Sequence, residues 1–271
     1  MRESTIFATD QTVRSRCRHP WTLIAFALLL TCGITSTGNG SQDATAAAKE
    51  KAIAALEKLG GKVYRDESKP DRPLTGVDLD QTQATDDALA LLELFPDLQL
   101  LSLDETRVTD AGLVHLEKLT RLTDLDLDDT AIGDAGLSHL RGLLNLQNLT
   151  LTRSRVTDAG LAYITGMKRL QKLSLTRTRI TDAGLKHVKE LPRLEWLFLD
   201  YNPITDIGLA ELKRLNQLEV LFLNHTQVTD AGLEVLKGLK NLDAVSLNGT
   251  GVTDSGVSRL QKALPKASLI H

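Results

Sequence analysis

The stretch Leu98-Gln-Leu-Leu-Ser-Leu-Asp-Glu-Thr-Arg-Val-Thr-Asp-Ala-Gly-Leu-Val-His-Leu-Glu-Lys-Leu119 changes its apolar spacing halfway along. In its first six residues the apolar side chains alternate, which predicts a short strand with one face turned inward. From Asp110 onward a leucine returns at every third residue, which predicts a helix with one apolar stripe. One strand, one turn and one helix cannot bury these leucines alone, so the unit needs neighbours.

The same 24-residue block occurs eight times in succession without an insertion. The copies, called coils 1 to 8 below, begin at Leu74, Leu98, Leu122, Leu146, Leu170, Leu194, Leu218 and Leu242, and the last ends at Pro265. Stacked coils bury each other's leucines, as in repeat proteins generally. The sequence therefore predicts an α/β solenoid, curved, with a parallel sheet on its concave side and helices on its convex side.

The common pattern L-x-x-L-x-L-x-x-T-x-V-T-D-A-G-L-x-x-L-x-x-L resembles the leucine-rich repeat family over residues 74–265. Its Val-Thr-Asp-Ala-Gly-Leu form is similar to exported, planctomycete-like bacterial leucine-rich repeat proteins. It also resembles the substrate-receptor part of F-box ubiquitin ligases, whose repeats usually carry cysteine where this chain has threonine or leucine. We favour the bacterial group because the repeats lack cysteine and follow a leader rather than an F-box. The resemblance implies a non-enzymatic protein-interaction scaffold with no catalytic residues and no cofactor.

Residues 1–32 have the order of a secretory signal: basic residues, then an apolar run over 21–30, then a polar exit. That run is shorter than the about 20 apolar residues that a membrane-spanning helix needs. Leu29-Leu-Thr-Cys32 looks like a bacterial lipoprotein box, which makes Cys32 a candidate for lipidation. Thr31 departs from the usual small residue, so simple cleavage and an uncleaved anchor stay open. We expect export to the periplasm, the cell envelope or the medium.

The segments that flank the repeats are expected to cover their ends. A linker over residues 33–43 precedes a predicted amino-terminal cap over 44–73, in which an Ala- and Lys-rich helix ends at Gly60-Gly61. A short strand over 62–65 and a polar loop follow. Residues 266–271 are predicted to close the carboxyl end, because a terminal coil otherwise exposes its leucines.

Composition argues against several classes of protein. With 32 Lys+Arg against 35 Asp+Glu, the net charge of −3 lacks the basic excess of a nucleic-acid binder. Both cysteines, Cys17 and Cys32, lie in or at the edge of the leader, so the repeats hold no thiol nucleophile or disulfide. No catalytic motif and no inserted loop interrupts the coils. We therefore expect a monomer that is not an enzyme, with acidic side chains that are solvated.

Several columns of the repeat are predicted to be architectural. Aspartate occupies position 13 of every coil and, with the threonine before it, is predicted to cap a helix rather than to bind calcium. Glycine at position 15 predicts close backbone packing between coils, and hydroxyls at position 9 predict bonds to the backbone. His115, His139 and His187 share position 18. We expect them to form a solvated column rather than a zinc site.

Positions 3, 5, 7 and 8 vary, and they are predicted to face the concave side. They are acidic in coils 1 to 3, basic in coils 4 and 5, and aromatic in coils 6 and 7. Exposed aromatic residues beside arginine are typical of the centre of a protein interface. The candidate residues for binding a protein partner are Asp104, Asp126, Asp128, Arg153, Arg177, Trp196, Phe198, Tyr201, Phe222 and His225.

Overall fold

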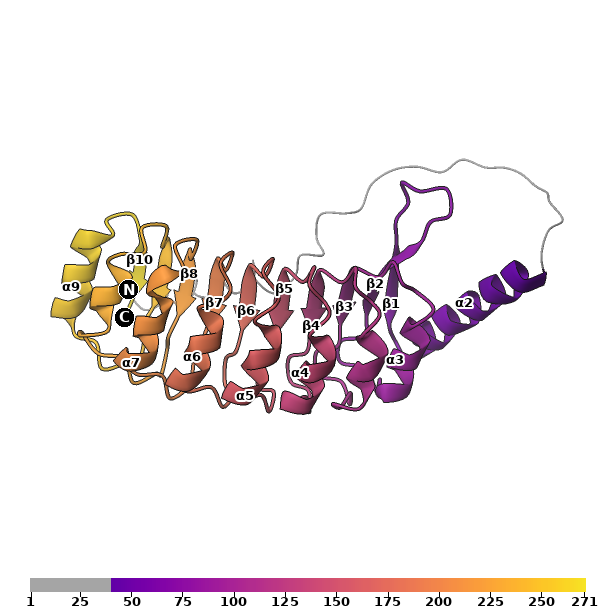
Figure 1. Cartoon of the computed structure of the whole chain (residues 1–271), viewed down its shortest axis with the longest axis horizontal. Helices are drawn as coiled ribbons and strands as arrows, with labels where there is room; N and C mark the ends of the chain where they lie inside the picture. Colours follow the sequence, from indigo (N-terminus) through magenta and orange to yellow (C-terminus); the bar gives the residue numbers. More distant parts are fainter. Residues whose placement is uncertain (1–39) are drawn as a thin grey trace, which may run out of the picture. The chain divides into compact units, whose positions relative to one another are not determined.

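The computed structural model describes the backbone of residues 40–271 and the side chains from residue 44 onward. Residues 45–271 form one compact unit, which is a row of stacked coils (Figure 1). The predicted leader, the candidate lipidation site Cys32 and most of the linker lie outside the described residues. In the part of the chain that is described, no helix is both long enough and apolar enough to cross a membrane.

Ten strands form one sheet in chain order. They are β1 (Lys62–Arg65), β2 (Leu74–Asp78), β3 (Leu100–Ser102), β4 (Asp124–Asp126), β5 (Asn148–Thr150), β6 (Lys172–Ser174), β7 (Trp196–Phe198), β8 (Val220–Phe222), β9 (Ala244–Ser246) and β10 (Ser268–Ile270). β1 is antiparallel to β2, and all later pairs are parallel. Equivalent residues pair, as in Leu101 with Leu125, so the repeat length sets the register. The predicted parallel sheet is confirmed.

The leucines of the pattern form one continuous core along the stack. In coil 3 each is at most 2% exposed: Leu122, Leu125, Leu127, Leu137, Leu140 and Leu143. The first three come from the strand side and the last three from the helical side, so the two periodicities meet in one layer. Fully burying a leucine contributes about 1.5–3 kcal/mol, which makes this layer the main source of stability.

The helical side is shorter and more varied than predicted. It consists of α2 (Gly40–Lys58) before the repeats, then α3 (Asp86–Leu92), η2 (Gly112–Leu116), α4 (Asp134–Leu140), α5 (Asp158–Leu161), η3 (Ala162–Ile164), α6 (Asp182–Val188), α7 (Asp206–Leu209), η4 (Ala210–Arg214), α8 (Leu233–Leu236) and α9 (Asp254–Ala263). The η segments are 3₁₀-helices, and η2 is the only helix of coil 2. A glycine inside a segment of one or two turns disfavours the α-helix, and 3₁₀-helices are used in such short pieces.

Each end of the leucine stack has a cover. At the amino end, Ala52, Ile53 and Leu56 of α2 are buried, and β1 pairs along the outer edge of β2. At the carboxyl end, β10 continues the sheet beside β9, and Leu264 lies in the core. These covers leave the long concave face and its two edges as the places where the surface varies from coil to coil.

Candidate functional site

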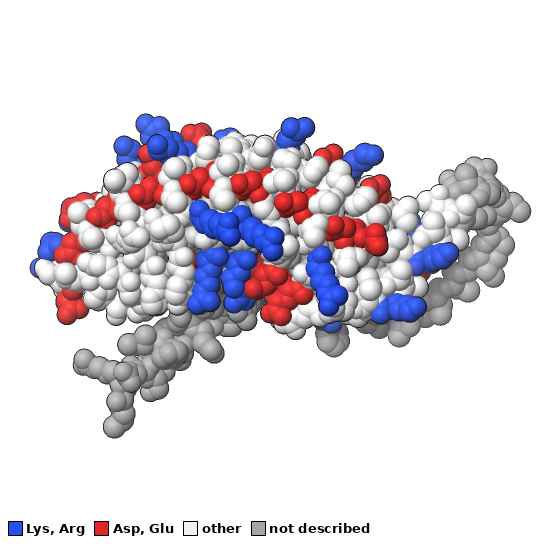
Figure 2. All heavy atoms as spheres, turned by 90° about the horizontal axis from the view of Figure 1, so that it is seen from below, with Lys and Arg blue, Asp and Glu red and all other residues white. Residues whose placement is uncertain are grey.

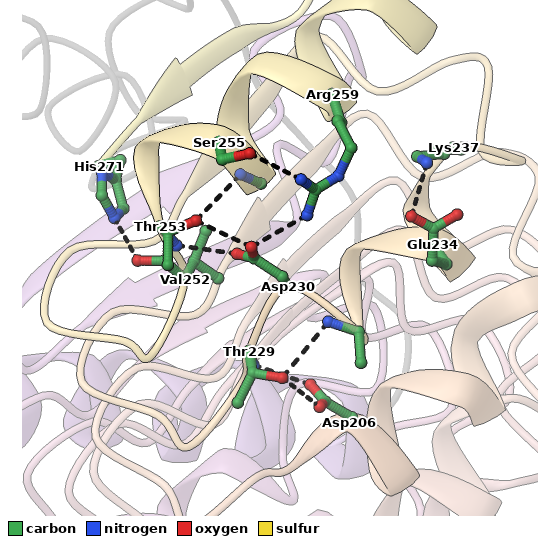
Figure 3. Close-up of polar contacts among 12 residues, drawn as sticks. Asp206, Thr229, Asp230, Glu234, Lys237, Val252, Thr253, Ser255, Arg259 and His271 are labelled. Carbon is green, nitrogen blue, oxygen red and sulfur yellow. Dashed lines mark hydrogen bonds and ion pairs between the residues drawn. The ribbon is translucent and has the colours of Figure 1, made fainter.

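The aspartate column ties each coil to the next. Asp206 Oδ1 accepts the N–H of Thr229 at 2.8 Å, and its Oδ2 accepts the Thr229 hydroxyl at 2.6 Å (Figure 3). Asp230 and Thr253 repeat the arrangement at 2.8 Å for both bonds. Thr229 Oγ1 in turn accepts the N–H of Ala231 at 3.3 Å. The capping prediction is therefore confirmed for the threonines of coils 4 to 8, whereas coils 1 to 3 have no side-chain cap. It is wrong for aspartate, whose oxygens accept bonds from the following coil.

The glycine column makes room for that carboxylate. A Cβ atom on Gly160 would lie 2.3 Å from Asp134 Oδ1, and one on Gly256 would lie 2.0 Å from Asp230 Oδ1. The coils do pack closely here, but the nearest neighbour is the aspartate side chain rather than the backbone that we expected. Position 15 therefore holds glycine because position 13 of the preceding coil holds aspartate.

The threonines of the hydroxyl column each close the turn of their own coil, whereas the buried hydroxyl of Ser154 in coil 4 has no hydrogen-bond partner in the described part of the chain. Thr106 Oγ1 donates to the carbonyl of Leu103 at 2.7 Å, as the sequence predicts. Asn202 replaces threonine in coil 6, and its Nδ2 donates both to Leu199 at 3.1 Å and to Leu175 of the preceding coil at 2.7 Å. These bonds hold the chain where it leaves the strand, so they fix the position of the residue just before them.

That residue, at position 8, has a left-handed backbone in every coil. We call this column the rim; it consists of Gln81, Glu105, Asp129, Arg153, Arg177, Tyr201, His225 and Gly249, with φ between 52° and 67°. The left-handed conformation costs roughly 1–2 kcal/mol for a residue with a side chain. Each rim residue follows its strand by three residues, and the strands are parallel, so the rim lines one edge of the sheet.

Backbone bonds between coils hold the rim in place. The N–H of Tyr201 donates to the carbonyl of Asn224 at 2.8 Å, and the N–H of His225 donates to that of Asn248 at 2.8 Å. Tyr201 is 43% exposed, and Arg153, Arg177 and His225 are exposed as well. The rim thus presents side chains to solvent from a fixed backbone. Sequence reasoning placed these residues beside the concave face but gave no sign of their shared conformation.

Three rim side chains form a stack. The guanidinium of Arg177 lies 4.2 Å from the centre of the Tyr201 ring, and the Tyr201 and His225 rings are 4.3 Å apart and nearly parallel, at 19°. His225 then lies over Gly249, where a Cβ atom would approach its Nδ1 to 2.5 Å. Cation–π contact and ring stacking each contribute about 0.5–1.5 kcal/mol. The stack orders these side chains before any partner binds.

Two of the predicted aromatic residues are not exposed. Phe198 is 7% exposed and Phe222 1% exposed, and their rings pack edge to face with centres 5.1 Å apart. Trp196 is half-buried. The prediction that all these rings are exposed is wrong for the two phenylalanines, partly because neighbouring strands place large side chains against each other. The exposed aromatic surface of coils 6 and 7 is Tyr201 and His225.

Basic and acidic residues meet at the middle of the repeat body, where Figure 2 shows a compact basic group beside a compact acidic one. Arg153 forms an ion pair with Asp129 across coils 3 and 4. Arg155, Arg177 and Arg179 are exposed, and within the described residues they form no ion pair. The sequence-predicted arginines thus lie together, joined by two from position 10.

The acidic side chains of coils 1 to 3 are less solvated than expected. Burial, together with the neighbouring charge of Asp126, raises the pKa of Asp104 to about 7. Burial and Asp126 likewise raise the pKa of Asp128 to about 7. Asp104 Oδ1 is buried and has no hydrogen-bond partner in the described part of the chain. The expectation of solvated acids with ordinary pKa values is therefore wrong for these two.

Two groups of side chains have the residue types of metal sites. Carboxylate oxygens of Asp104, Glu105 and Asp129 lie within 4.8 Å of one another, but Asp129 already accepts a bond from Arg153. On the convex side, His115 Nδ1 lies 2.5 Å from Glu93 Oε1, and His139 lies 2.7 Å from Glu117. These histidines pair with the preceding coil rather than standing free in solvent as expected.

The comparisons with known proteins agree with this architecture. Two family profiles described as leucine-rich repeat match residues 144–204 and 118–140. Among curated proteins none matches the chain.

Solved structures resemble the fold more widely. Internalin C2 from Listeria monocytogenes is 26% identical with a TM-score of 0.60, over 72% of this chain and 80% of that one. Two Arabidopsis thaliana receptor-kinase ectodomains are each 18% identical to this chain. HAESA in complex with an IDA peptide hormone has a TM-score of 0.60, over 86% of this chain and 41% of that one. GASSHO1/SCHENGEN3 in complex with CASPARIAN STRIP INTEGRITY FACTOR 2 has a TM-score of 0.54, over 77% of this chain and 25% of that one. The chain folds as a leucine-rich repeat solenoid.

Proposed function

We propose that this chain is a non-enzymatic scaffold that binds another protein through the concave face and the rim. The proposal rests on a contrast between the architectural columns of the repeat and the rim column. Positions that hold the coils together keep one residue type, whereas the rim changes from acidic to basic to aromatic on a fixed backbone. A surface that is rigid, exposed and rich in Arg, Tyr and His has the composition of a protein interface.

The fold accommodates such a function. The two plant ectodomains of this fold are described in complex with a peptide hormone and with CASPARIAN STRIP INTEGRITY FACTOR 2. A sheet edge that stays ordered without a ligand loses little conformational entropy on binding, which favours affinity. The half-buried acids Asp104 and Asp128 at the other end of the concave face are not needed for this proposal, because the rim of coils 4 to 7 does not include them.

A photo-cross-linking residue at one of two tyrosines tests the proposal in the full chain. Tyr201 is on the rim and is 43% exposed, while Tyr163 is on the helical side and is 41% exposed, so the two sites match in residue type and accessibility. We expect a cross-linked protein partner from position 201 and none from position 163 in cells that produce the chain. The same adduct from both positions, or adducts from position 163 alone, would contradict a rim-directed interface.

We further propose that the scaffold acts at the bacterial cell envelope. The support is the order of basic, apolar and small residues over 1–32, which is typical of an export signal. Mass spectrometry of the mature amino terminus separates the two processed forms, because lipidation leaves a modified Cys32 as the first residue and simple cleavage leaves an unmodified later one. An unprocessed chain recovered from the cytosol would instead favour an intracellular receptor.

A further inference from the structure

The basic part of the rim has more positive charge than its surroundings neutralise. Arg155 and Arg179 at position 10 flank Arg177, and all three are exposed without an ion pair in the described residues. Within the part of the chain that the structure describes, Arg153 alone among these four guanidinium groups has an acidic partner, Asp129. Exposed guanidinium groups that lie close together repel one another. Such a group therefore favours an anionic ligand, which relieves the repulsion.

The stack restricts which ligand the rim can meet. Arg177 and His225 lie in the coils before and after Tyr201, so they cover the two faces of its ring. A sugar ring or an aromatic side chain therefore finds no open ring face on Tyr201. What stays accessible is the ring edge, the hydroxyl and the guanidinium, and of these the hydroxyl and the guanidinium donate hydrogen bonds.

We infer that the rim of coils 4 to 7 binds a short acidic stretch of a partner protein, an inference that rests on the proposed protein-binding function. Guanidinium groups bind carboxylates through paired, charge-assisted hydrogen bonds. Three steps of about 4.8 Å separate coil 4 from coil 7, a span of about 14 Å that four or five extended residues cover. On the side of coil 4 that faces coils 2 and 3, the rim continues with Asp129 and Glu105, which would repel further acidic residues of the partner.

The acidic neighbours also favour a protein over a nucleic acid. A nucleic-acid strand carries charge along its whole length and needs a basic surface that continues. Here the basic group ends at Asp129, and the whole chain has a net charge of −3. An acidic stretch about five residues long spans the rim of coils 4 to 7 without extending over the acidic residues of coils 2 and 3.

Fluorescence anisotropy with labelled peptides on the full chain tests this inference. The probes are peptides with five glutamates, five glutamines or five lysines between Gly-Ser flanks, and a single-stranded oligonucleotide. We expect the glutamate peptide alone to bind, more weakly at about 0.3 M salt than at about 0.05 M because the charges are exposed. Extending it to ten glutamates should add little affinity. No binding of the glutamate peptide, or tighter binding of the oligonucleotide, overturns the inference.

Two double variants with the same loss of charge locate the site. Arg177→Ala with Arg179→Ala should weaken the glutamate peptide by at least about tenfold, which is about 1.4 kcal/mol. Arg193→Ala with Arg214→Ala, two exposed arginines that precede β7 and β8, should leave affinity unchanged. Equal losses in both variants would mean unspecific attraction and would overturn the site.

The stack makes a separate prediction about Tyr201. Tyr201→Phe keeps the ring beside Arg177 and should keep most of the affinity, whereas Tyr201→Ala frees the guanidinium and should lose several-fold. Tyr201 and Arg177 are both exposed, so the melting temperatures of the two Tyr201 variants should stay near that of the parent chain. Equal affinity of the two variants would exclude positioning by the stack. The cross-linking experiment separates the two proposals. If a partner is cross-linked at Tyr201 equally well in the Arg177→Ala, Arg179→Ala variant, the proposed function stands and the acidic-stretch inference is rejected.

Discussion

At the scale of the single residue, the aspartates of position 13 matter for the coil that follows them. Asp134 accepts two bonds from Thr157, to the amide at 2.8 Å and to the hydroxyl at 2.6 Å. Asp254 occupies the same column in coil 8, but it is exposed, and its Oδ1 lies 3.5 Å from His271 Nδ1. Asp134 thus bonds to the following coil, and Asp254, in the same column, is a matched residue that makes no such bond.

Asp134→Ala should lower the free energy of unfolding by about 1–3 kcal/mol, because a partly buried amide and hydroxyl lose their acceptor. Asp254→Ala should change it by less than about 0.5 kcal/mol, as is usual for exposed residues. Urea unfolding followed by circular dichroism measures both. If the two variants lost the same stability, the bonds between coils would not be the reason for the column.

At the scale of the element, each short helix is shaped by a side chain of the coil before it. Gly160 lies in α5, where alanine would ordinarily be preferred by about 1 kcal/mol. A Cβ atom there would meet Asp134 Oδ1 at 2.3 Å and Asp134 Cγ at 3.1 Å, so the carboxylate forbids the better helix former. The glycine is conditional on its partner rather than required by the backbone.

Gly160→Ala should therefore destabilise the wild-type chain and cost much less in the Asp134→Ala background, where the remaining close contact of its Cβ is the Leu137 Cδ1 methyl at 3.2 Å. The four free energies of unfolding from this double-mutant cycle give the coupling directly. Gly166→Ala is the control, since its nearest contact would be Leu144 at an ordinary 3.5 Å. Additive effects of the Gly160 and Asp134 changes would show that the clash is relieved elsewhere.

At the scale of the whole molecule, the crowded carboxylates of the concave face make stability depend on pH. The folded pKa of Asp104 and Asp128 is about 7, against an ordinary value of 3.8, so the folded chain binds more protons than the unfolded chain between these values. Their contribution is complete below about pH 4 and is lost as pH rises through about 7. Acids with a lowered pKa, such as Asp230, make stability rise with pH, but this effect lies at or below their ordinary pKa and so outside the range between about 4 and 7.

The melting temperature should accordingly be higher at pH 5 than at pH 8. Asp128→Asn keeps an oxygen for the amide of Thr152, which donates to Asp128 at 2.6 Å, and removes a repelling charge. It should raise the melting temperature at pH 8 and flatten the pH dependence. Asp243→Asn, at an exposed position, should do neither. A profile that rises from pH 5 to pH 8 would contradict this assignment.

The sequence predicts the architecture because the leucines act locally. Leu122 and its five partners in coil 3 follow two periodicities that each identify an element, and stacking follows from the repeat. The partner of Asp134 could not be predicted in this way, since Thr157 lies 23 residues further on. The exposure of Phe222 depends on what packs against it, and a period of two gives only its face of the sheet.

The bonds between coils have a consequence for how such a chain can change its size. The position-13 aspartates of coils 1 to 7 each bond to the coil that follows, and neighbouring coils pair in the same register. Duplicating residues 146–169 in frame would therefore reproduce the existing types of contact. The rim would lengthen by about 4.8 Å, one strand spacing, and would repeat one arginine pair. Span and charge order can therefore be edited in whole modules while the scaffold itself is conserved.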